Sequence, residues 1–214
     1  MVTDSSIKPD IKATYDKIAK HFDATRGYMW DECKTFIDTA KDSSLFLDIG
    51  CGNGRNSLYA IQKGFTVIAS DISIGQLNIV KSKAETENQD ISLIQCDAIS
   101  LPLKSKSFDR IMFIAAIHHL PTEVERIKSL VEIKSLMRPD GRALISAWAL
   151  NQPKFKDIKT DDGDVILKWD GKYDRFYHLF NDGELESLCK TANLTVVSAF
   201  KSHGNYYVEV SKRH

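Results

Sequence analysis

The segment Leu47-Asp48-Ile49-Gly50-Cys51-Gly52-Asn53-Gly54 decides the predicted fold, because its three glycines follow directly on a short apolar run. That run, residues 45–49, is typical of a buried strand, and residues 53–63 predict a helix behind the glycines. Glycines between a strand and a helix permit a sharp turn and let a ligand lie against the backbone. The spacing G-x-G-x-G departs from the dinucleotide fingerprint G-x-G-x-x-G, and no lysine completes a phosphate-binding P-loop. The segment therefore predicts a ligand-binding turn and disfavours a dinucleotide.

Strands and helices alternate along the chain on either side of this turn. Further strands are predicted at residues 65–69, 91–96, 108–116 and 143–148, and a terminal hairpin at residues 195–200 and 206–210. Helices are predicted at residues 11–22, 30–40 and 74–84, after Pro121, and from Asn181 to Ala192. This alternation is typical of an α/β fold, in which a mostly parallel sheet carries helices on both faces.

Two of these helices carry more specific signals. Val124, Ile127 and Val131 recur at i, i+3 and i+7, and this spacing predicts a helix after Pro121. Asn181 is followed three residues later by Glu184, which predicts an N-cap with a capping box at the start of the last helix.

Length and composition predict one domain covering residues 1–214. Within it, we expect residues 1–43 to form a helical cap ahead of the sheet and residues 151–178 to form an insertion near the substrate side. Residues 151–175 show no periodicity, so we expect an exposed, irregular segment there. That segment holds the acidic residues Asp157, Asp161, Asp162 and Asp164.

Charge and cysteine usage exclude several classes of protein. Lys plus Arg and Asp plus Glu number 29 each, so charge alone does not hold this chain on nucleic acid. No run approaches the roughly 18 apolar residues of a membrane span, and no signal peptide opens the chain. The four cysteines lie far apart without a C-x-x-C pair, which predicts neither a zinc site nor a disulfide framework. We therefore expect a cytoplasmic protein that has no metal site of its own and does not contact a membrane.

Acidic residues stand near the ends of three successive predicted strands. Asp48 belongs to the first strand, Asp71 follows the second, and Asp97 follows the third. A carboxylate after the second strand can accept both hydroxyls of a ribose, and a polar group after the third can receive an adenine amino group. The pattern predicts an adenosine-containing ligand without phosphates, and the cationic sulfonium of S-adenosylmethionine suits such an acidic pocket. The alternative is that the acids only cap helices in a related fold.

A series of motifs around these acids resembles the class I S-adenosylmethionine-dependent methyltransferases. The motifs are D-I-G-C-G-N-G at 48–54, Ser70-Asp71, Cys96-Asp97-Ala98, Leu101-Pro102-Leu103 and Ser107-Phe108-Asp109. The resemblance implies a Rossmann-like seven-stranded sheet of order 3-2-1-4-5-7-6, with strand 7 antiparallel and helices on both faces. It implies that S-adenosylmethionine is bound by Asp48, Gly50, Gly52, Asn53, Gly54, Asp71, Ile72, Asp97, Ala98 and Ala115.

A second series of motifs resembles, more narrowly, the tRNA carboxymethyluridine methyltransferases. It consists of Tyr15-Asp16-Lys17-Ile18-Ala19-Lys20-His21-Phe22, Thr25-Arg26, Trp30, Ala115-Ala116-Ile117-His118-His119-Leu120, Ala147-Trp148-Ala149-Leu150, Phe176-Tyr177-His178-Leu179-Phe180 and Gly183-Glu184-Leu185. That resemblance implies methylation of the carboxylate of 5-carboxymethyluridine at the tRNA wobble position. It also implies two partners: the anticodon region of tRNA, and a small zinc-binding activator protein that pairs along the third strand near Ile91-Ser92-Leu93-Ile94-Gln95-Cys96.

The chemistry of a carboxylate acceptor suggests roles for the remaining motif residues. A carboxylic acid with a pKa near ~4 is ionised at neutral pH and needs no general base. We hypothesise that Arg26 and His118 hold this carboxylate, Arg26 through its planar guanidinium. The methionine carboxylate of the cofactor is an equally good partner for Arg26. The expected contacts to the base come from Trp30, His119, Trp148, Tyr177 and His178, each of which could instead pack within the protein.

Two other functions fit the same fold. The neutral net charge favours a methyltransferase that acts on the carboxylate or enolic oxygen of a small molecule. A catalytically silent methyltransferase-like subunit is the third possibility, and the intact glycine turn and acids count against it. The aromatic and histidine motifs favour the tRNA enzyme.

Overall fold

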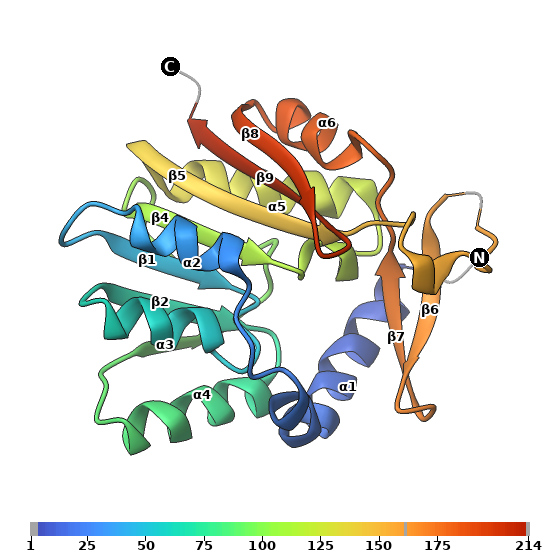
Figure 1. Ribbon diagram of the computed structural model, residues 1–214, viewed down its shortest axis with the longest axis horizontal. Helices are drawn as coiled ribbons and strands as arrows, with labels where there is room; N and C mark the ends of the chain where they lie inside the picture. Colours follow the sequence, from blue (N-terminus) through green and yellow to red (C-terminus); the bar gives the residue numbers. More distant parts are fainter. Residues whose placement is uncertain (1–3, 161, 213–214) are drawn as a thin grey trace.

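A seven-stranded sheet in the order β3-β2-β1-β4-β5-β9-β8 forms the centre of the computed structural model (Figure 1). The structure describes residues 4–160 and 162–212 of the chain, so Asp161 of the predicted insertion lies outside the described residues. Its strands are β1 (Leu45–Ile49), β2 (Thr66–Asp71), β3 (Ser92–Gln95), β4 (Phe108–Ile114), β5 (Met137–Trp148), β8 (Leu194–Ser202) and β9 (Asn205–Lys212). Strands β1 to β5 are parallel, whereas β9 is antiparallel to both β5 and β8. The predicted strand order and the antiparallel seventh strand are confirmed.

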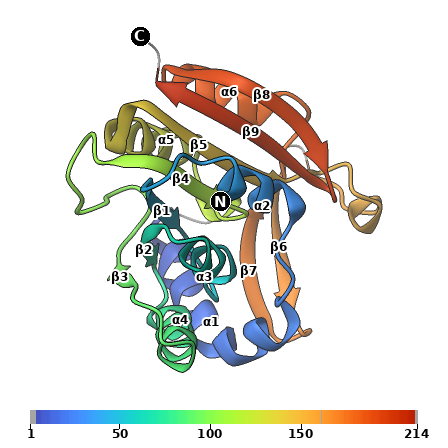
Figure 2. The ribbon, with the colours of Figure 1, turned by 60° about the vertical axis from the view of Figure 1, so that its left-hand side comes forward.

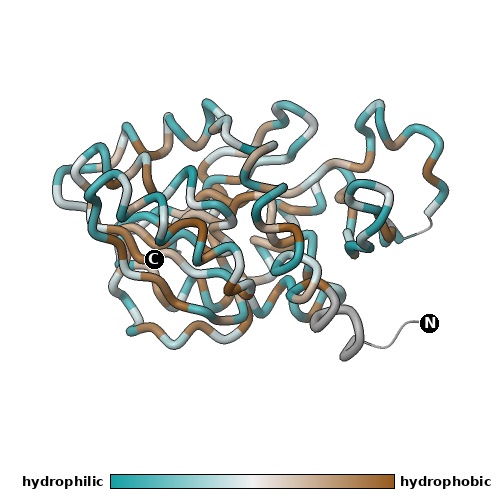
Figure 3. Tube along the Cα trace, turned by 90° about the horizontal axis from the view of Figure 1, so that it is seen from below, coloured by the Kyte–Doolittle hydropathy of each residue, from teal (hydrophilic) through white to brown (hydrophobic). Residues whose placement is uncertain are grey.

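Helices cover both faces of this sheet, because successive strand residues point to opposite sides. The helices are α1 (Asp4–Thr25), α2 (Asp31–Asp38), α3 (Arg55–Gln62), α4 (Ile74–Thr86), α5 (Glu123–Leu136) and α6 (Glu184–Thr191), with short 3₁₀ turns at Ile117–His119 and Pro153–Phe155. On β4, Ile111 packs in the cluster with α5 and α6, and the next residue, Met112, packs in the cluster with α2 and α3. Hydrophobic residues accordingly gather along the interior of the trace in Figure 3. Within the described residues, no helix is long and apolar enough to span a membrane.

The predicted helix after Pro121 is present as α5, but two of the three residues whose spacing predicted it are exposed. Val124 is 74% exposed and Val131 is 47% exposed. The side of α5 that faces the sheet instead carries Leu130, Ile133 and Leu136, all buried. Both sets of residues have helical spacing, so periodicity alone could not choose between them.

The segment predicted to be irregular contains an antiparallel hairpin. Its strands are β6 (Asp164–Trp169) and β7 (Tyr173–His178), which form a separate two-stranded sheet. Side chains alternate along β6, where Ile166 is 54% exposed while its neighbours Val165 and Leu167 pack against a small apolar cluster. In the sequence the consecutive apolar residues Val165, Ile166 and Leu167 hide this alternation, and the strand is only six residues long. Helix α1 lies between this hairpin and α4 (Figures 1 and 2).

The predicted cap of α6 is present only in part. The helix begins at Glu184 after Gly183, whose φ of 73° is in the left-handed region, so Asn181 is not the N-cap. One half of the capping box does form, because the Asn181 backbone N–H donates to Glu184 Oε2 at 2.9 Å.

Candidate functional site

The glycine turn after β1 is close-packed on both sides. Gly50 and Gly52 have φ angles of +62° and +54°, which L side chains rarely adopt. A Cβ on Gly50 would lie 2.7 Å from Ala116 Cβ, and one on Gly52 would lie 3.4 Å from the ring of Phe22. Gly54 serves a different contact, since its Cβ would lie 2.8 Å from the Val80 side chain of α4. At the end of β1, the turn therefore places backbone without side chains close to Ala116 and Phe22.

A cavity, the glycine-loop cavity, opens beside this turn and is bordered by α1. The described residues that line it are Ile11, Tyr15, Phe22, Ile49, Gly50, Cys51, Gly52, Asn53, Arg55, Asn56, Ser70, Asp71, Ile72, Cys96, Asp97, Ala98, Phe113, Ile114, Ala115, Ala116, His119 and Leu120. Eight of the ten residues predicted to bind the cofactor are among them, and only Asp48 and Gly54 are not. The three residues from α1 were not predicted, although Ile11, Tyr15 and Phe22 have the spacing of one helix face.

Asp48 lies beneath the turn rather than in the glycine-loop cavity. It is buried, and Ser57 Oγ of α3 donates to its Oδ2 at 2.6 Å. Burial raises the pKa of the Asp48 carboxyl to about 7 despite this hydrogen bond. The contact that the structure shows for Asp48 fixes α3 against β1, and its position gives no support to the predicted contact with a ligand.

Asp71 joins the glycine turn to the end of β2. Its two carboxylate oxygens accept the backbone N–H groups of Gly52 and Ser73, each at 2.9 Å. Burial raises the pKa of Asp71 to about 6, these hydrogen bonds oppose the rise, and the nearby Asp16 adds to it. Asp97 lies across the cavity and accepts the N–H of Ile99 at 3.1 Å. The acids predicted at the second and third strand ends therefore reach the same cavity.

The two adjacent histidines separate, and their predicted roles change. His118 is buried and does not line the cavity; its ring stacks on Tyr177 at 5.0 Å, and its Nδ1 accepts the N–H of Trp148 at 3.3 Å. His119 lines the cavity instead. The Phe176 carbonyl 2.8 Å from His119 Nδ1 can only accept, so Nδ1 carries the proton and Nε2 accepts the Tyr15 hydroxyl at 2.8 Å.

Both histidines are held neutral by their surroundings. Burial lowers the pKa of His118 well below its usual value, and the nearby His119 and Arg175 add to this effect. Burial likewise lowers the pKa of His119 to about 3. His118 is thus buried and uncharged and lines neither pocket, so its position gives no support to the hypothesis that it holds an acceptor carboxylate.

A second pocket, the cationic pocket, lies beside the glycine-loop cavity. The described residues that line it are Thr25, Arg26, Tyr28, Trp30, Arg55, Trp148, Gln152, Lys154, His203 and Asn205. Three of them, Arg26, Arg55 and Lys154, have basic side chains, and none of these described residues is acidic. Three residues predicted to contact the acceptor, Arg26, Trp30 and Trp148, therefore come together here, whereas Gln152, Lys154, His203 and Asn205 belong to no motif and were missed.

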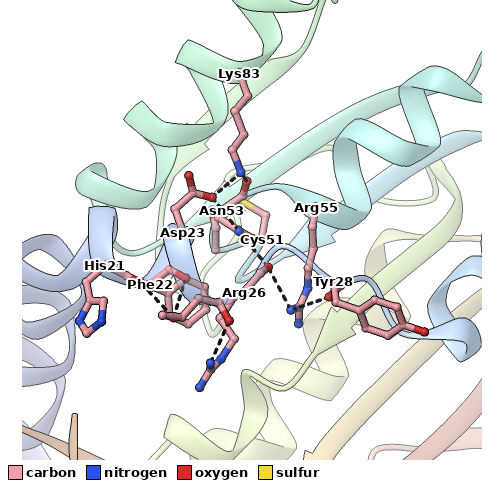
Figure 4. A network of polar contacts seen from close by, with 11 residues as sticks. His21, Phe22, Asp23, Arg26, Tyr28, Cys51, Asn53, Arg55 and Lys83 are labelled. Atoms are coloured by element: carbon pink, nitrogen blue, oxygen red, sulfur yellow. Dashed lines mark hydrogen bonds and ion pairs between the residues drawn. The ribbon is translucent and has the colours of Figure 1, made fainter. Parts of the chain in front are cut away.

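Arg55 stands between the two pockets and is the one described residue that lines both. Its guanidinium lies over the Trp30 ring at 4.6 Å, and its Nη1 donates to the carbonyls of Arg26 at 3.4 Å and Tyr28 at 3.1 Å. Figure 4 shows this arginine reaching from the start of α3 to the segment that follows α1. Arg55 therefore ties the glycine turn to one wall of the cationic pocket.

The same segment is fastened a second time by Asn53 of the glycine turn (Figure 4). Asn53 Nδ2 donates to the Arg26 carbonyl at 3.1 Å and to Asp23 Oδ1 at 2.9 Å. Lys83 of α4 forms an ion pair with Asp23. These contacts hold the end of α1 beside both pockets.

Tyr177 and His178 of β7 do not line either pocket. Tyr177 is buried and stacks on Trp148 with ring centroids 4.7 Å apart. His178 lies between two carboxylates, with Nδ1 2.6 Å from Asp164 and Nε2 2.6 Å from Glu184. The contacts that the structure shows for Tyr177 and His178 are packing and hydrogen bonds, which hold the hairpin against α6, and their positions give no support to the predicted contacts with a base.

Comparisons with known proteins bear on what these pockets bind. The family model "Methyltransferase domain" matches residues 47–145. A protein of Encephalitozoon cuniculi whose name assigns it provisionally to the methyltransferases is 30% identical, over 86% of each chain. The chain belongs to the class I S-adenosylmethionine-dependent methyltransferases. It is an enzyme, and its cofactor is S-adenosylmethionine.

Two further relatives carry a more specific name. The tRNA (carboxymethyluridine(34)-5-O)-methyltransferase of Schizosaccharomyces pombe is 28% identical, over 94% of this chain and 96% of its own. The enzyme of the same name, alkbh8, from Xenopus tropicalis is 29% identical over 94% of this chain, which spans 40% of that relative's length. The methyltransferase described here therefore resembles the tRNA carboxymethyluridine methyltransferases.

Solved structures agree with this fold. The 1,6-didemethyltoxoflavin-N1-methyltransferase of Burkholderia thailandensis, with bound S-adenosylhomocysteine, superimposes with a TM-score of 0.77 at 19% identity, over 100% of this chain and 92% of its own. A complex from Haloferax volcanii between the Trm112 methyltransferase activator and a methyltransferase matches with a TM-score of 0.75 at 14% identity, over 95% of this chain and 98% of the other.

Proposed function

We propose that this enzyme methylates the carboxylate of 5-carboxymethyluridine at the tRNA wobble position. The observation that carries the proposal is the cationic pocket, where Arg26, Arg55 and Lys154 converge without an acidic residue among the described lining. In a chain of zero net charge, such a pocket favours an anionic acceptor. The names of the relatives from fission yeast and frog supply the identity of that acceptor.

The glycine-loop cavity fits S-adenosylmethionine in shape and charge. Gly50 and Gly52 leave bare backbone where a Cβ would meet Ala116 or Phe22. Asp71 would accept the ribose hydroxyls, and the walls formed by Ile72 and Ala98 would enclose the adenine ring. Asp71 and Asp97 line this cavity together with Arg55, and no lysine is among its described lining residues, which suits a cofactor that carries a sulfonium, a carboxylate and no phosphate.

The acceptor's carboxylate would be held by Arg26, Arg55 and Lys154, and its base would lie against Trp30 and Trp148. The carboxylate is already ionised at neutral pH, so no protein group has to remove a proton. When bound, S-adenosylmethionine supplies the methyl group: the carboxylate oxygen forms the new bond to carbon as the carbon–sulfur bond breaks, and the electron pair stays on sulfur. The chain contributes in-line positioning and exclusion of water, which suffice for this transfer.

Labelled methyl transfer to bulk tRNA tests the proposal. We expect label in a single nucleoside after nuclease digestion, released as volatile methanol by mild alkali because a methyl ester hydrolyses under conditions that spare N-methyl and C-methyl groups. Label found only on small molecules would reject the tRNA acceptor and favour a small-molecule carboxyl methyltransferase. Absence of S-adenosylhomocysteine binding by calorimetry would point to a catalytically silent subunit.

We further propose that the enzyme works with a small zinc-binding activator protein that pairs along β3. β3 is an edge strand whose Leu93 and Ile94 are only half-buried, and an exposed edge of this kind can accept another strand. In one structural neighbour, a methyltransferase is in complex with the activator Trm112. An isolated chain that is soluble, monomeric and fully active would refute the need for the activator protein.

We also propose that the cap at residues 1–43 and the insertion at residues 151–178 belong to the acceptor side of a single domain.

A further inference from the structure

Two buried amide side chains on the wall of the cationic pocket lack hydrogen-bond partners. Gln152 is 9% exposed and Asn205 is 2% exposed, yet among the described residues nothing pairs with Gln152 Nε2 or Asn205 Oδ1. Buried polar atoms are nearly always paired, because an unpaired one has lost its water without compensation. One unpaired donor and one unpaired acceptor on the same wall therefore call for a ligand that supplies the opposite pair.

A hydrogen bond fixes the orientation of the Asn205 amide, and close packing confines the Gln152 side chain. Asn205 Nδ2 donates to the carbonyl of His203 at 3.3 Å, so the unpaired atom of Asn205 is its acceptor oxygen. Gln152 packs against Gly204, where a Cβ would lie 2.5 Å from Gln152 Oε1. Both amides thus meet at the turn between β8 and β9, and only a glycine at position 204 leaves room for this arrangement.

This turn lies beside the aromatic part of the pocket. Asn205 is paired with Trp148 in the β5–β9 register, and the N–H of Ala149 donates to the Gly204 carbonyl at 3.0 Å. Lys154 Nζ lies 3.6 Å from the centre of the Trp148 ring. An aromatic face, a cation, an N–H donor and a carbonyl acceptor are therefore brought to one wall.

We propose that this wall reads the imide edge of a uracil ring. Asn205 Oδ1 accepts the N3–H of the base, and Gln152 Nε2 donates to an adjacent carbonyl oxygen, while the ring lies against Trp148. Cytosine lacks the N3 proton and carries an amino group in place of O4, so the same wall rejects it. The inference rests on the proposed function for the acceptor and adds the residues that choose the base.

The experiment compares two anticodon stem-loop RNAs, one with 5-carboxymethyluridine at the wobble position and one in which that base is also methylated at N3. Binding is measured by calorimetry in the presence of S-adenosylhomocysteine, and methyl transfer is measured in parallel. We expect the protein without substitutions to bind the first RNA at least about tenfold more tightly than the second. Asn205→Ala and Gln152→Ala should reduce this preference to about twofold or less, whereas Gln62→Ala, an exposed control on α3, should retain it.

The preference, rather than the activity, is the readout, because a merely structural defect weakens both RNAs equally. If Asn205→Ala does not fold, Gly204→Ala provides a second variant, since it displaces Gln152 without removing a polar group. Equal binding of the two RNAs by the unmodified chain, or an unchanged preference in all three variants, would overturn the inference. If the unmodified chain discriminates in binding but transfers no methyl group, the proposed reaction fails while the reading of the base stands.

Discussion

The glycine-loop cavity and the cationic pocket share Arg55 but are built in opposite ways. The glycine-loop cavity draws most of its walls from the ends of β1, β2, β3 and β4, where parallel strands bring short motifs to one edge. The cationic pocket takes its walls from the segment after α1, the start of α3, the end of β5, the segment before β6 and the β8–β9 turn. The glycine-loop cavity depends on short motifs at neighbouring strand ends and contains the acids Asp71 and Asp97. The cationic pocket is assembled from more distant segments, and no acid is among its described lining residues. This contrast predicts that variants should affect one pocket without the other, except at their boundary.

The largest effect is expected at the boundary itself. Arg55→Met removes a half-buried guanidinium that lines both pockets and donates to the carbonyls of Arg26 and Tyr28. We expect kcat/KM to fall about 1,000-fold, equivalent to ~4 kcal/mol, with weaker binding of both S-adenosylhomocysteine and the RNA. Steady-state kinetics and two calorimetric titrations measure this. Lys34→Met, an exposed cation on α2, is the control, and loss of only one of the two affinities would show that Arg55 serves one pocket.

Asp71→Asn should weaken binding in the glycine-loop cavity without affecting binding in the cationic pocket. The asparagine would set an N–H group against the backbone N–H of Gly52 or Ser73 and would lose a charged acceptor for the ribose. Calorimetry should show about 100-fold weaker S-adenosylhomocysteine binding, ~3 kcal/mol, with RNA affinity unchanged. Asp90→Asn, on an exposed loop, is the matched control. An equal loss of RNA affinity would contradict the independence of the two pockets.

The different construction of the pockets explains what could be predicted from sequence. The glycine turn, Asp71 and Asp97 lie next to predicted strands, and the carboxyl ends of parallel strands share one edge, so their meeting could be inferred. Gln152, Lys154 and Asn205 belong to no motif, and only the folded hairpins bring them together. Their presence in the cationic pocket depends on tertiary contacts that no local pattern encodes.

Adjacent residues mark a second limit of sequence reasoning. His118 and His119 are chemically identical, and they lie in a short 3₁₀ turn whose orientation depends on its surroundings. The Phe176 carbonyl and the Tyr15 hydroxyl, both distant in sequence, turn His119 toward the cavity and leave His118 in the aromatic stack. A pattern can place such a pair at a strand end, but it does not tell which member reaches the ligand.

The neutral state of His119, which lines the glycine-loop cavity, predicts how the free energy of unfolding depends on pH. Its pKa is about 3 in the folded chain and ~6.5 when unfolded, so the unfolded chain takes up the proton first as the pH falls. Its stabilising contribution is complete above pH ~6.5 and is lost between pH ~6.5 and ~3. His119→Asn keeps a donor for Phe176 and does not titrate. Urea unfolding should therefore show the native chain losing about 2 kcal/mol more than this variant between pH 7 and pH 5. Equal losses would mean that His119 is not buried neutral.

The smallest effect is expected from one cation of the cationic pocket. Lys154→Met removes the charge that lies over Trp148 but keeps an apolar stem of similar length. We expect KM for the RNA to rise about tenfold, ~1.4 kcal/mol, and the slope of log affinity against log salt to fall by about one, as for the loss of one ionic contact. S-adenosylhomocysteine binding should not change, because Lys154 does not line the glycine-loop cavity.

Lys190→Met, at the end of α6, removes an exposed lysine elsewhere and serves as the control for net charge. If both variants reduced RNA affinity and the salt slope alike, the overall charge of the chain rather than the cationic pocket would govern RNA binding. If Lys154→Met alone changed the slope, Lys154 would be assigned to the acceptor. In that case a pocket assembled from distant segments would supply the positive charge that the composition of this neutral chain conceals, and the zero net charge would no longer favour a small-molecule substrate.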